Sequence, residues 1–520
     1  MNGARALLST LVESGVDVCF ANPGTSEMHF VAALDEVPQM RGILTLFEGV
    51  ATGAADGYGR MTGRPAATLL HLGPGLGNGL ANLHNARRAR TPVVNIVGDH
   101  ATYHTRYDAP LESDIASIAG SVSGWYRVTA RADDVGADAA DAVAAATGPP
   151  GCVATLVLPA DASWSESDTG PCATRPKVRP SPAPTELVDQ LAQVLRSGEK
   201  TALLLGGTSV RARGLHAASR VCATTGAMLL GETFPANLER GAGIPALDRL
   251  GYLAEFAQAQ LDGVQHLILV DAKAPVSFFA YPGKASDLVP AGCTVHTLAW
   301  PGQDAPGALE TLAEAVGAAQ GSAIPAPAAR PDRPTGPLSP ATLAAALGAA
   351  LPEGAIVVDE GNTSGLFVAG ATAGAPPHDW LTLTGGAIGI GLPAATGAAV
   401  AAPDRPVLCL QADGSAMYTL QALWTQARED LNVTTVVLAN RSYAILNMEL
   451  QRVGADAGGP AARRLLDLTE PDLDFTALSQ GLGVPARRVE SAEELTKALE
   501  ASFAEPGPSL IEVPLPQSLG

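Results

Sequence analysis

The chain has 520 residues, with 52 Asp and Glu against 33 Lys and Arg and a formal net charge of −19. This length is too great for one hydrophobic core and predicts two to four domains of about 100–200 residues, of which three fit best. The sequence lacks a Lys/Arg-rich tract, an uncharged run of roughly 18–20 apolar residues and any metal-type spacing among its six cysteines, which argues against nucleic acid, a membrane span and a cysteine metal site.

The first residues predict an amphipathic helix, because Ala4, Leu7, Leu8 and Leu11 recur at three- and four-residue spacing. Glu13 lies in the same segment, so it is not read as a secretory signal, and a soluble cytoplasmic protein is expected. A β-like run over 16–20 comes next. The loop after it contains proline and glycine, which favour a tight turn in any fold. Its residues are Asn22, Pro23, Gly24, Thr25, Ser26 and Glu27.

Glu48 opens a predicted helix of small residues that ends at Arg60. Such a glutamate could simply cap the helix, whereas a buried one requires a partner. Farther along, His71 precedes a Gly-Pro-Gly-Leu-Gly-Asn segment that ends at Asn78, and His100 lies in the tract 98–104. His71 is either a proton relay near neutral pH or a satisfied histidine at a strand end, and His100 is either a candidate site residue or part of a helix or loop surface.

The chain as a whole alternates short β-branched runs with Ala-rich helical segments, as parallel α/β domains do. Pro-rich polar stretches at 163–185 and 321–340 predict linkers. The expected fold class is therefore α/β, with three doubly wound parallel-sheet domains. Their predicted limits are 1–170, 185–322 and 338–520. Strands are predicted at 92–97, 153–158, 202–205, 266–270 and 355–358.

Two strand-like runs in the last third, 407–411 and 433–439, lead into oxygen-bearing side chains. Asp413 follows the first run and Asn440 follows the second. Mg²⁺ prefers octahedral oxygen coordination, to which a protein commonly contributes one or two side chains, so this pair fits a magnesium site. Gly414 would admit a close backbone approach, and Ser415 could bond a phosphate oxygen at a helix N-terminus. An ordinary β-turn is the alternative.

The segment 385–393 is rich in glycine, and Gly389, Gly391 and Ala394 fit a loose dinucleotide fingerprint. Asp413 falls roughly where the ribose-binding acid of that fold would lie. However, Gly414 and Ser415 follow this acid directly and Asn440 lies beyond it. This arrangement favours a metal cage over ribose recognition.

These motifs, taken together over essentially the whole chain, resemble the thiamine diphosphate (ThDP) superfamily of acetolactate synthase and benzoylformate decarboxylase. Ala412 departs from the family pattern Gly-Asp-Gly…Asn at its first glycine. The resemblance implies that Glu48 bonds N1′ of the aminopyrimidine, and that Asp413, Asn440 and the carbonyl of Ser442 bind Mg²⁺. The remaining cofactor contacts that it implies are Asn22, Pro23, Gly24, Asn78, Asn362, Thr363, Gly386, Ile388, Gly414, Ser415 and Tyr443. Among these, the Gly386 carbonyl would receive the 4′-amino hydrogen and Ile388 would be the apolar wedge that bends the cofactor.

The implied reaction is decarboxylation of a 2-oxo acid, after which the enamine is protonated to an aldehyde or ligated to a second carbonyl. Thr25, Ser26, His71 and His100 are the substrate-side candidates. The resemblance further implies a homodimer or homotetramer with active sites between chains.

A flavin is not expected, because 271–282 lacks the segment of flavin-containing synthases and no flavin motif is visible. Phe278, Phe279 and Tyr281 indicate either an apolar wall or core packing. Two alternatives stay open: a flavin-containing acetolactate synthase proper, and a catalytically silent ThDP-binding paralogue.

Overall fold

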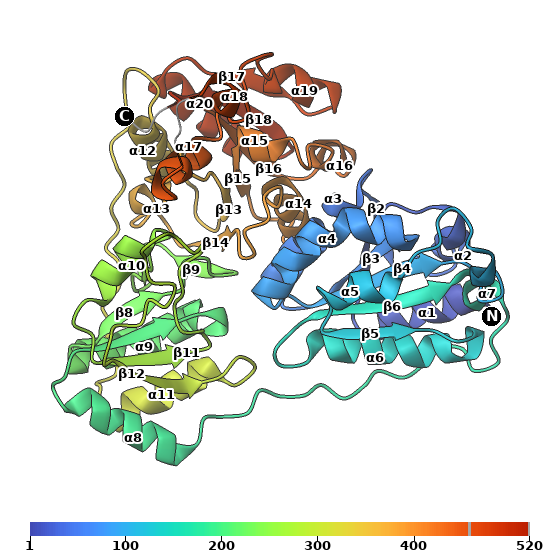
Figure 1. Cartoon of the computed structure of the whole chain (residues 1–520), viewed down its shortest axis with the longest axis horizontal. Helices are drawn as coiled ribbons and strands as arrows, with labels where there is room; N and C mark the ends of the chain where they lie inside the picture. Colours follow the sequence, from blue (N-terminus) through green and yellow to red (C-terminus); the bar gives the residue numbers. More distant parts are fainter. Residues whose placement is uncertain (456–458, 518–520) are drawn as a thin grey trace.

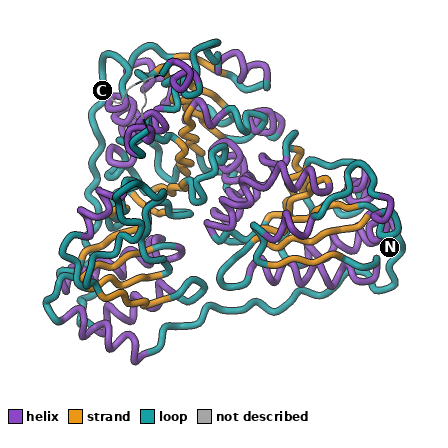
Figure 2. The backbone as a smooth tube through the Cα atoms, in the orientation of Figure 1, coloured by secondary structure: helices purple, strands orange, loops and turns teal. Residues whose placement is uncertain are grey.

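A computed structural model describes residues 1–455 and 459–517. Figure 1 shows three α/β lobes at the corners of a triangle, each built on its own sheet. Long irregular segments connect them: α7 (Ala160–Trp164) ends well before α8 (Thr185–Arg196), and α11 (Ala305–Ala315) ends well before α12 (Pro340–Ala350). The loop colour of Figure 2 follows the first of these segments along one side of the triangle. The two predicted linkers, 163–185 and 321–340, largely coincide with these stretches and overlap the adjoining helices by one or two residues.

The N-terminal lobe holds a six-stranded sheet of order β2-β1-β3-β4-β6-β5, in which all neighbouring strands are parallel. Its central strands are buried on both faces, which explains why they read as continuous apolar runs. The strands are β1 Val18–Ala21, β2 Arg41–Leu44, β3 Ala66–His71, β4 Val93–Asp99, β5 Trp125–Val128 and β6 Val153–Pro159. The helices before α7 are α1 Gly3–Glu13, η1 Thr25–Glu27, α2 Met28–Ala33, α3 Glu48–Thr62, α4 Leu72–Ala89, η2 Thr105–Tyr107, α5 Ile115–Gly120, η3 Ala132–Asp134 and α6 Val135–Thr147.

The central lobe holds a five-stranded parallel sheet of order β10-β8-β7-β11-β12. The chain moves outward from β7 to one side and then from β11 to the other, which is doubly wound topology. The strands are β7 Thr201–Leu205, β8 Met228–Gly231, β10 Asp248–Arg249, β11 His266–Val270 and β12 Thr294–Ala299. Besides α8 and α11, the helices are η4 Gly207–Val210, α9 Ala212–Thr225 and α10 Ala254–Leu261.

The C-terminal lobe holds a seven-stranded sheet of order β17-β18-β16-β15-β13-β14-β9. The edge strand β9 (Leu238–Arg240) comes from the middle of the chain and is antiparallel to β14. The other strands are β13 Ile356–Glu360, β14 His378–Thr382, β15 Val407–Ala412, β16 Val433–Ala439, β17 Ala486–Arg488 and β18 Ser509–Pro514. The helices after α12 are α13 Val368–Ala371, α14 Gly391–Ala401, α15 Asp413–Ala416, α16 Ala422–Arg428, α17 Ala444–Arg452, α18 Pro460–Arg464, α19 Phe475–Gly481 and α20 Ala492–Ala504.

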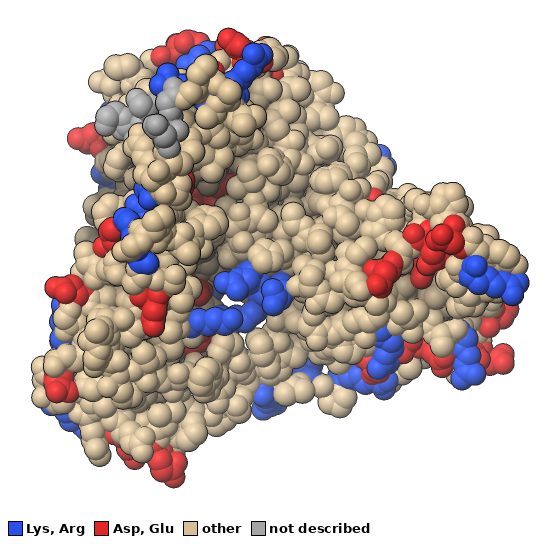
Figure 3. Space-filling view, viewed as in Figure 1, with Lys and Arg blue, Asp and Glu red and all other residues tan. Residues whose placement is uncertain are grey.

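The predicted fold class is confirmed: three doubly wound sheets, parallel apart from β9, are covered by helices. The first predicted helix is also confirmed, since α1 buries Leu7, Leu8 and Leu11. No helix within the described ranges is long and apolar enough to cross a membrane. On the face drawn in Figure 3, basic side chains gather where the three lobes meet.

The N-terminal and C-terminal lobes meet through α3 and α14, whose backbones approach closely at small residues. Gly57 lies against the backbone of Ala394, and Gly397 lies against that of Ala54, so neither glycine has room for a side chain. This joint fixes the start of α3, which carries Glu48, relative to the start of α14.

Candidate active site

Most of the predicted site residues lie at the carboxyl ends of parallel strands, in two groups. We call the residues after β1, β2, β3 and β4 the N-terminal half-site, and those after β13, β14, β15 and β16 the C-terminal half-site. Each set of strands is contiguous within its sheet. Because parallel strands end at the same edge, the sequence-distant residues of each group share one edge of one lobe, where ligands of α/β folds bind.

Backbone strain marks the same places. Non-glycine residues adopt left-handed conformations at Leu46 (φ 56°), Leu72 (φ 51°), Asn362 (φ 46°) and Arg441 (φ 57°). Leu46 lies two residues before Glu48, and Leu72 directly follows His71. Arg441 directly follows Asn440. Such conformations are unfavourable for side chains with a Cβ and concentrate at functional sites, where surrounding structure maintains them.

In the N-terminal half-site, Glu48 is the first residue of α3, and its side chain is buried. Asn78 of α4 donates a hydrogen bond from Nδ2 to Oε2 of Glu48 at 3.0 Å. The other oxygen, Oε1, lies near Gly75 and accepts no hydrogen bond from the described residues. A buried carboxyl with one free oxygen is equipped to exchange a proton or hydrogen bond with a ligand.

His71, at the end of β3, pairs with Glu27, which comes from the loop after β1. The two side chains approach at 2.8 Å between Nδ1 and Oε2. Oε2 of Glu27 also accepts the N–H of Gly24 at 2.7 Å, and its Oε1 is buried without a partner among the described residues. Burial raises the pKa of Glu27, and the charge of His71 opposes that rise. The two side chains are therefore held within hydrogen-bond distance of each other at this strand edge.

The other N-terminal candidates surround this pair. Thr25 and Ser26 form η1 next to Gly24, whose Cα faces the His71 ring. His100 directly follows β4. In the sheet register His71 lies opposite Gly98, which comes two residues before His100. The Nε2 atom of His100 is buried without a hydrogen-bond partner in the described ranges. The structure thus brings the substrate-side candidates to one strand edge.

In the C-terminal half-site, Asp413 and Asn440 end the neighbouring strands β15 and β16. Asp413 is buried and accepts two backbone N–H groups, from Gly414 at 2.8 Å and from Arg441 at 2.6 Å. Burial raises the pKa of Asp413, and these two hydrogen bonds oppose the rise. Asn440 accepts the N–H of Ser442 at 3.1 Å and donates to Ser364 at 3.2 Å. Fixed carboxylate and amide oxygens on adjacent strand ends fit a hard cation.

The residues around Asp413 differ in part from the expected pattern. Gly414 lies against the ring of Tyr443, so a side chain at this position would collide with that ring. The Ser415 hydroxyl donates to the Ala412 carbonyl at 3.1 Å and accepts from Gln411 at 2.7 Å. Ser415 therefore holds its own turn together in this structure, and its contact with a phosphate stays a prediction.

The segment after β14 runs between the lobes as far as α14. Glu360, at the end of β13, is fully buried and accepts the N–H groups of Gly389 at 2.6 Å and Gly391 at 2.7 Å. Gly386 adopts a left-handed conformation (φ 76°), and the ring of Phe278 from the central lobe packs against it. Ile388 lies two residues farther along and is partly buried against the core. Asn362 and Thr363 lie in the turn after Glu360.

Sequence reasoning gave no role to Glu27 or Glu360. Each acquires one only through partners that are distant in the chain: His71 for the first, and the glycine turn at 389–391 for the second. For Glu360 the available signal was an acid close to the end of the predicted strand 355–358, because a carboxyl at a buried strand end must find partners, whereas Glu27, in the loop well beyond the run 16–20, gave no such signal.

The geometry offers two kinds of chemistry on two strand edges. One edge carries the acid–base groups Glu48, His71 and Glu27, and the other carries an oxygen-rich pair able to hold a cation and the phosphates that it binds. An enzyme that activates a phosphate-bearing organic cofactor by proton transfer needs both.

Comparison with known proteins agrees with this division. Residues 1–119 match the family model described as thiamine pyrophosphate enzyme, N-terminal TPP binding domain, and residues 359–513 match the corresponding C-terminal TPP binding domain. The chain is 63% identical over 522 residues to the Mycobacterium tuberculosis protein named “Putative acetolactate synthase large subunit IlvX”, with 100% of both chains covered. It is 30% identical to benzoylformate decarboxylase of Pseudomonas aeruginosa, with 96% of each covered.

Solved structures share the fold over the whole chain. The Rhodococcus jostii thiamine diphosphate-dependent 4-hydroxybenzoylformate decarboxylase superposes with a TM-score of 0.87 at 24% identity, covering 100% of both chains. At that identity the likeness concerns the fold alone, and it extends to all three lobes.

Proposed function

Because the chain belongs to the thiamine pyrophosphate enzyme family, we propose that it is a ThDP- and Mg²⁺-dependent enzyme that decarboxylates a 2-oxo acid. The observation that carries this proposal is the pair of half-sites: a buried Glu48 with one free carboxylate oxygen, and Asp413 beside Asn440 on adjacent strand ends. Both halves of the required chemistry are intact in one sequence. A catalytically silent paralogue would be expected to lose one of them.

The residues present fit the cofactor. Asp413, Asn440 and the Ser442 carbonyl would hold Mg²⁺ and through it the diphosphate, with Asn362 and Thr363 on the neighbouring strand end. ThDP, when bound, supplies a carbon nucleophile and an electron sink for the carboxylate that leaves. The chain's own task is to orient the reactants, exclude water and move protons.

Proton transfer is assigned to the N-terminal half-site. Glu48 would protonate N1′ of the aminopyrimidine, because its buried carboxyl has a free oxygen and a fixed orientation from Asn78. His71, held by Glu27, would exchange the proton on the substrate side, with Thr25, Ser26 and His100 lining the same edge. A buried carboxyl beside the imidazole keeps that ring oriented and its proton available.

A second copy of the chain is proposed to complete each site. Large apolar side chains next to both half-sites are exposed in the single chain: Leu46 beside Glu48, Leu366 and Phe367 after Thr363, and Met417 and Tyr418 after Ser415. Several large apolar side chains that are exposed close together are typical of an interface. A homodimer or homotetramer in which Glu48 of one chain faces Asp413 of another would bury it.

We also propose that no flavin is bound. In the central lobe the crevice between β7 and β11, where a doubly wound sheet takes its ligand, holds the carboxylate of Asp271. Oδ2 of this carboxylate accepts hydrogen bonds from the Thr208 N–H at 2.8 Å and from the Thr208 hydroxyl at 3.1 Å. The donors that a nucleotide phosphate would use are thus engaged by the protein.

Two outcomes compete after loss of CO₂: release of an aldehyde, and joining to a second carbonyl compound. The name of the benzoylformate decarboxylase relative favours the first, and that of the acetolactate synthase relative favours the second. Incubation with ThDP, Mg²⁺ and pyruvate or benzoylformate, with CO₂ and the organic product measured together, decides between them. No CO₂ from any 2-oxo acid in a broad panel would overturn the proposed reaction.

A further inference from the structure

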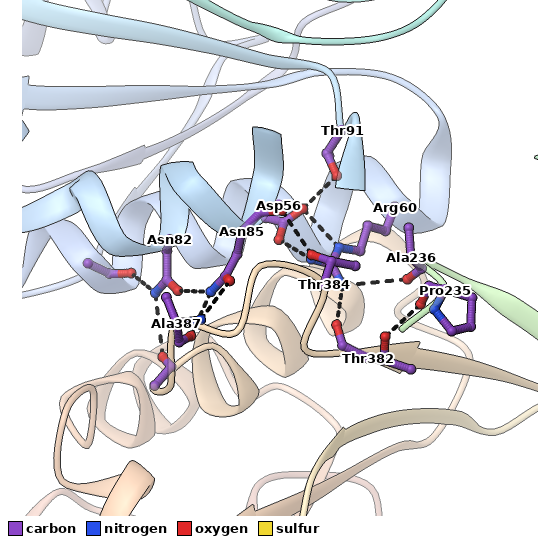
Figure 4. Close-up of polar contacts among 12 residues, drawn as sticks. Asp56, Arg60, Asn82, Asn85, Thr91, Pro235, Ala236, Thr382, Thr384 and Ala387 are labelled. Carbon is purple, nitrogen blue, oxygen red and sulfur yellow. Dashed lines mark hydrogen bonds and ion pairs between the residues drawn. The ribbon is translucent and has the colours of Figure 1, made fainter. Parts of the chain in front are cut away.

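Helix α4 of the N-terminal lobe holds the segment 384–389 of the C-terminal lobe in the same chain (Figure 4). Asn85 binds both backbone groups of Ala387: its Nδ2 donates to the carbonyl at 2.8 Å, and its Oδ1 accepts the N–H at 3.3 Å. A side-chain amide that matches the N–H and the C=O of one residue fixes the orientation of the two peptide units that flank that residue.

Neighbouring side chains of α4 extend this contact along the segment. Asn82 donates from Nδ2 to the Gly389 carbonyl at 3.4 Å, and its Oδ1 accepts from Asn85 at 3.0 Å. Nε2 of His84 lies 3.2 Å from the Gly385 carbonyl. The carbonyls of residues 385, 387 and 389 therefore all face α4.

The two carbonyls between these, of Gly386 and Ile388, lack such hydrogen bonds, because nothing within the described part of the chain donates to them. The left-handed conformation of Gly386 (φ 76°) turns the chain so that this alternation is possible. The N–H of Ala387 points to Asn85, so the Gly386 carbonyl of the same trans peptide points away from α4, where it is free to accept a hydrogen bond from a ligand.

The start of the segment is anchored by a buried ion pair of α3. Arg60 pairs with Asp56, and both side chains are almost fully buried. Arg60 also donates to the Thr382 carbonyl at 2.6 Å and to the Thr384 hydroxyl at 2.9 Å, and that hydroxyl donates to the Asn85 carbonyl at 2.9 Å. Figure 4 shows these contacts as one continuous network between the lobes.

We propose that Asn85, supported by Asn82, is a positioning residue that sets the conformation of 385–389 for the cofactor. This inference rests on the proposed function and on the cofactor contacts that the resemblance implies for Gly386 and Ile388. Asn82 also donates to the carbonyl of Gly49, next to Glu48, at 2.8 Å. The same asparagine pair therefore ties the segment to the start of α3, so that α4 links the two half-sites of one chain.

The test uses the full chain and the variants Asn85→Ala and Asn85→Ser, with Asn95→Ala as the matched control. Asn95 is an equally buried asparagine of the same lobe whose side chain bonds Thr68 and Thr155 across the sheet. Amide hydrogen exchange over 384–391 is measured in the apoprotein, and ThDP affinity in the presence of Mg²⁺ is measured by titration calorimetry. Loss of a buried two-point contact is expected to speed exchange in this segment and to weaken ThDP binding about tenfold.

The two readouts separate this inference from the proposed function. Faster exchange in the Asn85 variants with an unchanged segment in Asn95→Ala supports the positioning role, even if no 2-oxo acid is turned over. Unchanged exchange and unchanged ThDP affinity in a folded Asn85 variant would overturn it while leaving the proposed reaction intact. Equal loosening in Asn95→Ala would reduce the effect to general destabilisation and would also overturn it.

Discussion

At the carboxyl ends of its strands the C-terminal sheet presents Asp413 and Asn440, whose oxygens are fixed by backbone N–H groups and remain available on one side. The central sheet fills the same place with its own side chains. Asp271 accepts hydrogen bonds from Thr208 and pairs with Arg90 of the N-terminal lobe, with 2.5 Å between Arg90 Nη1 and Asp271 Oδ1.

One architecture therefore serves two purposes in this molecule. The strand edge is a candidate site where backbone N–H groups hold the carboxylate, and a joint between lobes where an arginine of another lobe pairs with it. Fold alone does not separate these cases, since both sheets are doubly wound. The residues that follow each strand do separate the two cases. Substitutions at the candidate site should impair catalysis or cofactor binding, whereas a substitution at the central edge should lower stability.

The largest effect is expected from Glu48→Gln in the N-terminal half-site. The amide keeps the shape and the contact with Asn78 but cannot protonate the cofactor, so kcat should fall by about 10²–10⁴-fold. ThDP affinity and the unfolding midpoint should change little. Steady-state turnover of the accepted 2-oxo acid, with calorimetric ThDP binding beside it, measures both. Full activity of this variant would refute the assigned mechanism.

Asp413→Ala should act on retention of the cofactor rather than on the chemical step. Removing the carboxylate takes away the proposed Mg²⁺ ligand and leaves the N–H groups of Gly414 and Arg441 without their acceptor. The ThDP concentration needed for half-saturation should rise at least about tenfold, with a parallel rise for Mg²⁺. Titration of the apoprotein with each component checks this, and a normal Mg²⁺ requirement would count against the metal assignment.

Most of this C-terminal edge could be predicted from the sequence, because its residues follow strands that are themselves predicted from their composition. The expected strand 433–439 coincides with β16, and the expected run 407–411 lies within β15, so Asp413 and Asn440 follow strand ends as predicted. Sequence reasoning assigned no role to Asp271, because the region 271–282 indicated the lack of a flavin segment and no contact of this carboxylate. Its partner Arg90 is 181 residues away, and no local pattern encodes a pairing at that distance.

Partners that are distant in the chain also decide the roles of residues inside a motif that the sequence does reveal. Asp56 and Arg60 lie on the helix predicted from Glu48 onward, yet their roles depend on Thr91, Thr382 and Thr384 from other segments. Helical spacing brings the acid and the arginine together at i and i+4. Which lobes they join is decided by tertiary packing, which the sequence of the helix does not contain.

In the central lobe, Asp271→Asn should lower stability and leave catalysis alone. Asparagine tolerates the left-handed backbone of this residue (φ 53°), so the change removes mainly the charge that Arg90 faces. Since the Asp271 side chain is buried and Arg90 is partly exposed, the loss of unfolding free energy should be about 1–3 kcal/mol. Urea unfolding measures this. A matched change in the exposed pair of Arg5 and Glu36, Glu36→Gln, should cost under about 1 kcal/mol.

A normal kcat in Asp271→Asn, within about twofold of the unmodified protein, is the second half of that prediction. Loss of turnover without loss of stability would mean that the central edge takes part in catalysis, and the contrast between the two sheets would fail.

An effect on stability that depends on pH is expected from Glu232, which lies at the cavity formed in the central lobe by Tyr252, Lys273 and Phe278 among others. Burial raises the pKa of Glu232 from 4.5 to about 7, with Arg90 and the N–H of Gly207 opposing the rise. The folded state therefore keeps this proton to a higher pH than the unfolded chain does, and stability should fall as the pH rises from 4.5 to about 7.

Glu232→Gln removes that titration. The variant should be more stable than the unmodified protein at pH 8 and close to it at pH 5, with a difference between the two conditions on the order of 1–3 kcal/mol. Thermal unfolding at both pH values measures it, and Glu36→Gln again serves as the exposed control. Because Glu232 faces the central cavity and no candidate half-site, its ionisation should shift the unfolding midpoint without moving the pH profile of kcat. A shift in that profile would place this carboxyl within reach of the reacting groups and would join the central edge to the catalytic one.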